Sequence, residues 1–396
     1  MKRVDEVTGS REISATIEIS AVRDAGQLAD LRQDLVELHR SSRPGSPFEH
    51  PAWTQTWVGH FLPDGDLECV AVRDRAAGGA LIGFAPLYRA RYSAAGLNAT
   101  CIRPIGTGRQ QALTEVVQVL ALPDRTQDVL RAVIQHLETL PDWNWVQLSL
   151  NPDQGWLVPQ WLNDGASAVI THRNARPFVI LDDLPSDVDA LRGRLKRNVR
   201  ESIRRCRNRS AKFGDMTFRS TSDATEVEPL IGTLVDLHRM RSHMAGRVKH
   251  RDIFGEGQQA FLTEAATELA KEGLARVHLA EHRRRPVAAL LVLSDGGTDY
   301  ISATGLNPDY WELSLNTMLI FNALEQAVAQ DRSAVNLSTG PDIAKMRWSS
   351  TVRTYHDFAV VRTDRRSRWA YGAFNQLTLG LEYRHLLRRS SSASGD

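Results

Sequence analysis

The clearest pattern of apolar and polar positions runs through the second half of the chain. A continuous apolar run of buried-strand length leads into an Asp-Gly-Gly turn, and a second strand-like segment follows it. Beyond a loop, apolar residues recur at helical spacing, and a short strand and a Gly-Pro break come next. The expected elements are a strand at 286–293, a turn at 295–297, a strand at 299–304, a helix capped by Ser314, a strand at 335–338 and a loop over 339–348.

The first half of the chain carries an α/β pattern of its own. Its strands are expected at 15–20, 68–72, 80–88, 101–105 and 143–150, and its helices at 25–39, from Pro51 and at 127–140. We therefore expect an α/β protein with one domain over 1–165 and a second over 166–385. Each domain should hold a mixed, mostly antiparallel sheet flanked by helices. The polar end, residues 386–396, is expected to be a disordered tail.

Composition narrows the class of protein only slightly. A chain of 396 residues with 42% hydrophobic and 24% charged residues can bury a large core and favours two domains over one. The formal net charge is +2, so any affinity for nucleic acid must come from a local patch. No apolar run approaches the ~20 residues of a membrane span. Three widely spaced cysteines fit a reducing compartment, so we expect a cytoplasmic protein that is not embedded in a membrane.

The strongest local concentration of charge lies between Leu191 and Lys212. Ten arginines and lysines face a single acid there, Glu201, while apolar residues recur every three to four positions. This pattern predicts a basic helix that docks on the core and turns its cations outward. Such a face could hold RNA phosphates or the diphosphate of a nucleotide cofactor, or it could be an ordinary solvated helix. The candidate donor-binding cations are Arg194, Arg197, Arg204 and Arg205.

The order of these segments resembles the GNAT N-acetyltransferase fold. It is similar in particular to the branch that contains the CelD-like acetyltransferase domains and the Fem-type peptidyltransferases. The resemblance spans most of the chain and rests on segments 47–57, 83–89, 191–214 and 345–348, taken with the 286–348 pattern. It implies tandem GNAT-like domains, the second of them catalytic. It also implies an N-acyltransferase that forms an amide on the amine of a small molecule or a short peptide.

The same resemblance bears on the acyl donor. GNAT enzymes hold the diphosphate of coenzyme A with a glycine-rich loop that opens the helix after the hairpin. Here residues 307–317 contain no glycine and carry Asp309 and Glu312, although the N–H groups of Asn316 and Thr317 could still bind a donor. Fem-type enzymes also lack the loop and take the acyl group from aminoacyl-tRNA. We therefore expect aminoacyl-tRNA as the co-substrate, with acyl-CoA as the alternative and no tightly bound cofactor.

Amide formation requires a neutral amine, a polarised carbonyl and an acid for the leaving group. Lys345 stands where the family places a conserved lysine, and Tyr300 and Tyr310 are candidate acids. Asp309 and Glu312 are candidate bases or ligands of the acceptor ammonium. The expected catalytic residues are Lys345, Tyr310, Asp309 and Glu312, and the expected substrate-binding residues are His238, Arg247, Tyr300, Asn336, Arg347 and Trp348.

Two alternatives concern a metal site and a non-catalytic role. His238, His243 and His250 lack ligand spacing and an accompanying cysteine, so we expect no metal site. From another functional class, the chain could be a non-catalytic module whose arginine helix binds RNA or an anionic polymer. The acceptor amine and the oligomeric state stay open at this level.

Overall fold

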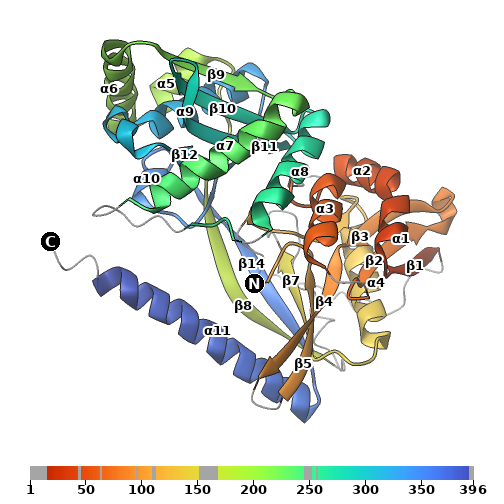
Figure 1. Cartoon of the computed structure of the whole chain (residues 1–396). Coiled ribbons are helices and arrows are strands. Elements are labelled where there is room, and N and C mark those ends of the chain that lie inside the picture. Colours follow the sequence, from red (N-terminus) through yellow and green to blue (C-terminus); the bar gives the residue numbers. More distant parts are fainter. Residues whose placement is uncertain are drawn as a thin grey trace, which may run out of the picture.

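The computed structural model describes residues 16–42, 46–62, 65–94, 97–108, 113–150, 168–244, 252–255 and 257–391. Two sheets organise these residues, with helices against both (Figure 1). The smaller sheet has the order β1-β2-β3-β6, and the larger has the order β4-β5-β7-β14-β8-β13-β12-β11-β10-β9. The predicted α/β class with mostly antiparallel sheets flanked by helices is confirmed.

The N-terminal unit contains the small sheet and one end of the large one. Helix α4 packs on β2 and β3, and Gly83 permits this because a Cβ there would lie 2.3 Å from the Val129 side chain. Its elements are β1 (Ile17–Val22), α1 (Ala25–Asp30), α2 (Arg32–Ser41), α3 (Pro51–Phe61), β2 (Cys69–Asp74), β3 (Ala80–Ala85), β4 (Leu87–Ala94), β5 (Leu97–Pro104), β6 (Leu120–Ala121), α4 (Thr126–Thr139) and β7 (Trp145–Leu150).

The C-terminal unit covers both faces of its sheet with helices. Side chains alternate along the strands, so Leu291 and Tyr300 belong to the core under α7 and α8, while Val292 and Ile301 belong to the core under α6 and α9. Its elements are β8 (Ala168–Leu181), α5 (Val188–Arg194), α6 (Arg197–Phe213), β9 (Met216–Thr221), α7 (Ala224–Ser242), α8 (Gln258–Lys271), β10 (Ala275–His282), β11 (Arg285–Asp295), β12 (Thr298–Leu306), the 3₁₀ turn η5 (Pro308–Leu313), α9 (Leu315–Ala329), β13 (Ala334–Thr339), α10 (Ile343–Met346), β14 (Val352–Arg362) and α11 (Arg365–Ser391).

The large sheet joins the two units into one structure. Strand β14 pairs with β8 on one side and with β7 of the N-terminal unit on the other. Helix α11 then returns to the N-terminal unit, where Tyr371 and Phe374 pack against Trp145. The placement of one unit on the other is therefore fixed by backbone hydrogen bonds as well as by side-chain packing.

Several sequence expectations differ from the structure in detail. The predicted single basic helix is two helices, because the backbone is extended at Leu195 and α6 begins at Arg197. Ser314 precedes α9 in a left-handed conformation and makes no capping side-chain bond. Residues 386–391, expected in the tail, continue α11, whereas 392–396 lie outside the described residues. The boundary at residue 165 also lies outside them, so it stays a prediction.

Candidate functional site

The candidate site lies where two neighbouring parallel strands stop pairing. β12 and β13 are paired only over Thr298–Tyr300 and Ala334–Asn336, although both strands continue beyond these residues. The Asn336 side-chain oxygen accepts a hydrogen bond from the N–H of Ser338, whose φ of 76° is left-handed, so β13 carries an irregularity here. Beyond these residues the backbone N–H and C=O groups of β12 and β13 do not hydrogen-bond to each other. A substrate group can therefore bind between the two strands.

Lys345 closes the end of β13. Its ammonium donates to the backbone carbonyls of Thr339 and Gly340, and its own N–H is capped by Asp342. Burial lowers the pKa of Lys345, while the nearby carboxylates of Asp342 and Glu115 raise it. An ammonium has three N–H donors, so one remains for a substrate oxygen.

Glu115 is a residue of this site that the sequence analysis did not find. It comes from the N-terminal unit, and its carboxylate accepts hydrogen bonds from the Ser338 hydroxyl and the Thr339 N–H. Burial raises the pKa of Glu115, and the cations of Lys345 and Arg176 partly offset this. The side chain is half-buried, so it stays within reach of a small ligand. No motif marks this position, because the contact joins segments more than 200 residues apart.

Arg176 on β8 anchors the backbone that carries Glu115. Its Nη1 donates to the carbonyl oxygen of Glu115 at 2.6 Å, and its Nη2 donates to Ser149 at 2.7 Å and to Asp357 at 2.6 Å. Asp357 on β14 also accepts from the Ser149 hydroxyl at 2.7 Å. These bonds connect β7, β14 and β8 with the loop before β6, and they fix where Glu115 meets β13.

Tyr300 is the last residue of β12 that pairs with β13. Its side chain is 6% exposed, and its ring meets Phe48 of the N-terminal unit edge-on at 6.1 Å. Burial raises the pKa of Tyr300 well above 10, and the neighbouring acids Glu49, Glu115 and Asp295 add to this. The phenol is therefore held neutral, as a hydrogen-bond donor.

His238 and Arg241 on α7 lie against the open end of β12. The Nδ1 atom of His238 is 3.0 Å from the Thr304 carbonyl, and its Nε2 is 3.4 Å from the N–H of Ile253. Arg241 donates to the Thr304 hydroxyl at 3.1 Å, and burial lowers the pKa of Arg241. Arg247, the predicted substrate-facing arginine, lies outside the described residues. Arg241 therefore supplies a cation here that the sequence analysis did not select.

On the opposite face of the sheet, Arg347 reaches the first turn of α9. Its Nη2 donates to the Thr317 hydroxyl at 2.8 Å, and its guanidinium lies 5.4 Å from the Trp348 ring centre. Burial lowers the pKa of Arg347. The Nε of Arg347 and the Oδ1 of Asn316 are buried and have no hydrogen-bond partner among the described residues. Asn316, Thr317 and Arg347 thus lie together at the start of α9, where the Thr317 N–H, expected to be available for a donor, is already bonded to the Ser314 carbonyl at 2.9 Å.

The basic face of α6 begins beside this region. Lys196, just before the helix, donates to the carbonyl of Met346 at 2.7 Å. Arg194 is held by two backbone carbonyls, and Arg197 pairs with Glu201 at 2.9 Å. Further along the helix, three exposed arginines form no hydrogen bond or ion pair with any described residue. These are Arg200, Arg204 and Arg205.

The structure does not bring all predicted catalytic residues together. The Tyr310 hydroxyl hydrogen-bonds His282 Nδ1 at 2.8 Å, and its ring packs on Phe213 at the end of α6. Lys345 lies near the start of α6, which is about 25 Å long at 1.5 Å per residue. Asp309 and Glu312 are exposed on the Tyr310 side, in η5. These three residues are therefore separated from Lys345.

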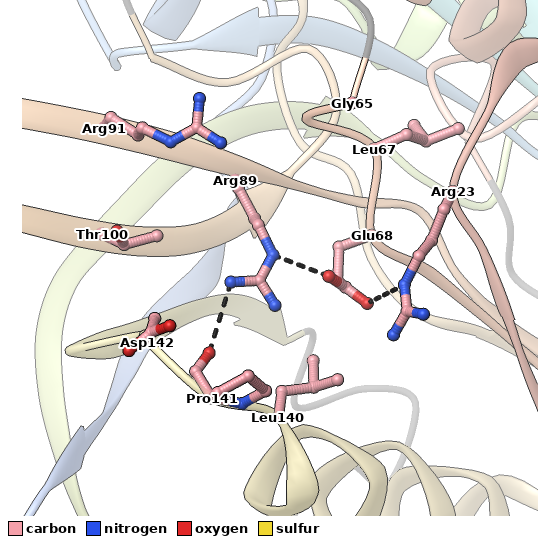
Figure 2. A pocket seen from close by; sticks show the side chains of 10 residues that line it. All are labelled: Arg23, Gly65, Leu67, Glu68, Arg89, Arg91, Thr100, Leu140, Pro141 and Asp142. Atoms are coloured by element: carbon pink, nitrogen blue, oxygen red, sulfur yellow. Dashed lines mark hydrogen bonds and ion pairs between the residues drawn. The ribbon is translucent and has the colours of Figure 1, made fainter.

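A separate cavity of about 620 Å³ lies in the N-terminal unit, between β4, the start of β2 and the turn after α4. Figure 2 shows the Glu68 carboxylate between the guanidiniums of Arg23 and Arg89, at 3.3 and 2.7 Å. Arg91 pairs with Asp66 at 2.8 Å. The three arginines are each paired with Glu68 or Asp66, so these ion pairs hold strands together.

Two other features are absent from the part of the chain that the structure describes. No helix there is long and apolar enough to cross a membrane. No group of three or more His, Cys, Asp or Glu side chains there is arranged to hold a metal ion.

Comparison with known proteins supports the fold. Residues 197–346 match the model of an acetyltransferase (GNAT) domain family. The crystal structure of FemX superposes with a TM-score of 0.61 at 10% identity, covering 90% of this chain and 100% of FemX. The C-terminal domain of a protein described as a lysylphosphatidylglycerol synthetase of Agrobacterium fabrum gives 0.50 at 11% identity, covering 88% and 96%. No curated protein matches in sequence. Residues 197–346 thus match a GNAT acetyltransferase domain, and the fold of the described chain is similar to that of FemX.

Proposed function

We propose that the chain is an N-acyltransferase that takes an aminoacyl group from aminoacyl-tRNA and transfers it to the amine of a small molecule or a short peptide. One observation carries the choice of donor: α6, which exposes Arg200, Arg204 and Arg205 without an ion pair to any described residue, begins beside the loop that holds Lys345. A polyanionic donor bound along that face would present its charged end at the site, since each neutralised phosphate contributes to binding.

The donor and the acceptor reach the site from opposite faces of the sheet. The donor approaches from the α6 and α9 face, past Arg347, and its carbonyl lies where β12 and β13 stop pairing. The remaining N–H of Lys345 stabilises the oxyanion that develops on that carbonyl, because a fixed donor in a half-buried site acts without reorganisation. The acceptor enters between the units, where Tyr300 and His238 lie. Direct transfer then needs no covalent enzyme intermediate.

The start of α9 supports the same donor. The N–H of Thr317 is already bonded to the carbonyl of Ser314 at 2.9 Å, and no glycine allows close backbone approach. The exposed carboxylates of Asp309 and Glu312 precede this helix and oppose a diphosphate. A coenzyme A diphosphate would thus find fewer backbone donors than the usual glycine-rich loop provides.

A second candidate donor, acyl-CoA, is favoured by one specific feature. The unpartnered buried atoms Arg347 Nε and Asn316 Oδ1 lie at the α9 start, where a phosphate and a ribose or amide group could satisfy them. The non-catalytic alternative, an RNA-binding module, rests on the α6 arginines alone.

The deciding experiment supplies the full chain with a mixture of charged tRNAs and a panel of amines, and in parallel with acyl-CoA. Product that ribonuclease abolishes supports the aminoacyl-tRNA enzyme. Ribonuclease-resistant product from acyl-CoA replaces the donor assignment. RNA binding without product in either mixture supports the binding module. A donor of this kind also places the protein in the cytoplasm, which fractionation of cells tests directly.

A further inference from the structure

The proposed reaction needs a proton acceptor, and neither of the carboxylates predicted as bases lies beside Lys345. The acceptor amine is an ammonium at neutral pH and cannot attack a carbonyl until it loses a proton. Asp309 and Glu312 are at the η5 end of α6. Asn336 cannot take a proton, and its side chain already accepts from Ser338. Asp342 lies beside Lys345, but it is exposed and caps the Lys345 N–H, so we expect the base to come from another part of the chain.

We infer that Glu115, supplied by the N-terminal unit, is the general base of the C-terminal acyltransferase site. This inference rests on the proposed function and assigns one step of it. Glu115 contacts β13 at Ser338 and Thr339, directly beyond the last residue that pairs with β12. It is half-buried, and it lies on the face of the sheet where the N-terminal unit and Tyr300 meet.

The step balances as follows in atoms and charge. Glu115 takes one proton from the acceptor ammonium, and the freed lone pair forms a C–N bond to the ester carbonyl of the donor. The ester C–O bond breaks, and the ribose oxygen leaves with a second proton from the same nitrogen. The products are an amide, a free ribose hydroxyl on the tRNA and one proton, which Glu115 releases to solvent.

The surroundings of Glu115 suit this role. The charged or titratable groups that face it are Lys345 from α10, Arg176 from β8 and Tyr300 from β12. Burial raises the pKa of its carboxyl, which makes the carboxylate a stronger base than a solvated glutamate. The cations of Lys345 and Arg176 partly offset the effect of burial on this pKa, and Lys345 lies where it can act on the carbonyl while Glu115 acts on the amine.

Another buried carboxylate nearby, Glu49, is a weaker candidate. Its two oxygens accept the backbone N–H groups of Ser46 at 2.7 Å and Gln118 at 2.9 Å, both in the N-terminal unit. The residue is only 3% exposed. Those bonds keep Glu49 inside the interface between units, whereas Glu115 touches β13 itself.

The test compares Glu115→Gln and Glu115→Asp with the wild-type chain, using steady-state rates with charged tRNA and the best amine between pH 5 and 9. Glu115→Gln keeps the shape and removes the proton acceptor, so we expect kcat to fall about 10²–10⁴-fold with little change in donor KM. The wild-type rate should fall as pH drops below the raised pKa of Glu115, and this limb should vanish in the variant. Glu115→Asp should restore part of the rate and the limb.

A matched control is Glu264→Gln, an exposed residue of α8 paired with His60 of α3 at 2.8 Å. It should keep the wild-type rate and pH profile, and thermal unfolding of each variant confirms that the fold is intact. A folded Glu115→Gln with native kcat and an unchanged acidic limb would overturn the inference while leaving the proposed function in place. Absence of transfer by the wild-type chain from any donor would instead remove the proposed function itself.

Discussion

Lys345 and Glu115 hydrogen-bond to the two backbone polar groups of one residue, Thr339. The Lys345 ammonium donates to the Thr339 carbonyl, and the Glu115 carboxylate accepts from the Thr339 N–H. The two side chains come from different units of the chain, so the end of β13 takes its final position only when the units are assembled. The large sheet also continues across both units: β14 pairs with β7 and β8, and Arg176 on β8 holds the Glu115 backbone.

Removal of the Lys345 ammonium should disable the chemistry and spare the fold. Lys345→Ala deletes the cation assigned to the developing oxyanion, and loss of one such donor costs about 2–4 kcal/mol, or about 10²–10³ in rate. Single-turnover measurement of acyl transfer checks this, with circular dichroism as the fold control. A folded Lys345→Ala variant with near-native single-turnover rates would return Lys345 to a structural role at the end of β13.

Charge reversal on the basic face of α6 should weaken donor binding without affecting the fold. Arg204→Glu with Arg205→Glu should raise the donor KM and lessen the salt dependence of tRNA binding, because each lost phosphate contact removes a slope of about 0.7–0.9 in log K against log salt. The two arginines are exposed and do not contact the core, so folding should survive.

The matched control for that variant is Arg365→Glu with Arg368→Glu, which makes the same charge change on the exposed start of α11. It should leave the donor KM and the salt slope near the wild-type values. Equal effects of the two double variants would mean that net charge, and not the α6 face, governs binding.

Gly305 allows α7 to pack closely against β12. A Cβ there would lie 2.6 Å from the Leu234 carbonyl oxygen and 2.8 Å from the His238 nitrogen, which are backbone atoms of α7. Gly305→Ala should therefore destabilise the protein by about 1–3 kcal/mol and move His238 from Thr304. Denaturant unfolding measures the first effect and acceptor KM the second. Gly193→Ala, which meets open space in helix α5, should be neutral or slightly stabilising, and similar losses in both variants would refute the close-packing argument.

The sequence was sufficient to predict the elements whose pattern is local. The β11–β12 hairpin followed from a continuous apolar run and the Asp-Gly-Gly turn, and both strands are present. The positions of Lys345 and Arg347 near the end of β13 followed from chain order. The break before α6 was missed, because the apolar spacing continues through Leu195 although its backbone leaves the helical region.

The parts that were missed depend on contacts between distant segments. Glu115 lies in an irregular segment with no periodic pattern, and its importance arises from meeting Ser338 and Thr339 in the folded chain. Tyr310 was selected as a candidate acid in the loop before α9, yet it contacts His282 and Phe213 at the end of α6, whereas Lys345 lies near the start of that helix. Pattern and spacing give the type of an element, whereas the distance between side chains on different elements is set by packing.

The buried carboxyl of Glu49 predicts a pH dependence of stability. Burial raises the pKa of Glu49 from 4.5 to about 7 in the folded chain, so the folded state binds its proton more tightly than the unfolded state. Stability should thus fall as pH rises from about 4.5 to 7, by about 3 kcal/mol for this group. Urea unfolding at pH 5 and pH 8 measures the change. Glu49→Gln should flatten it, whatever its absolute stability, and an unaltered slope in the variant would assign the effect to other groups.

The start of α9 predicts weak binding of coenzyme A. The glycine-free segment from Asn307 to Thr317 offers few free backbone donors, since the Thr317 N–H is bonded to Ser314, and Asp309 and Glu312 oppose a diphosphate. We expect a dissociation constant for coenzyme A or acetyl-CoA of about 10⁻⁴ M or weaker, equivalent to about 5 kcal/mol, by calorimetry. Arg347→Ala should weaken any residual binding further, because it removes the guanidinium at the helix start. Micromolar affinity that Arg347→Ala abolishes would make acyl-CoA the donor and leave the acyltransferase assignment unchanged.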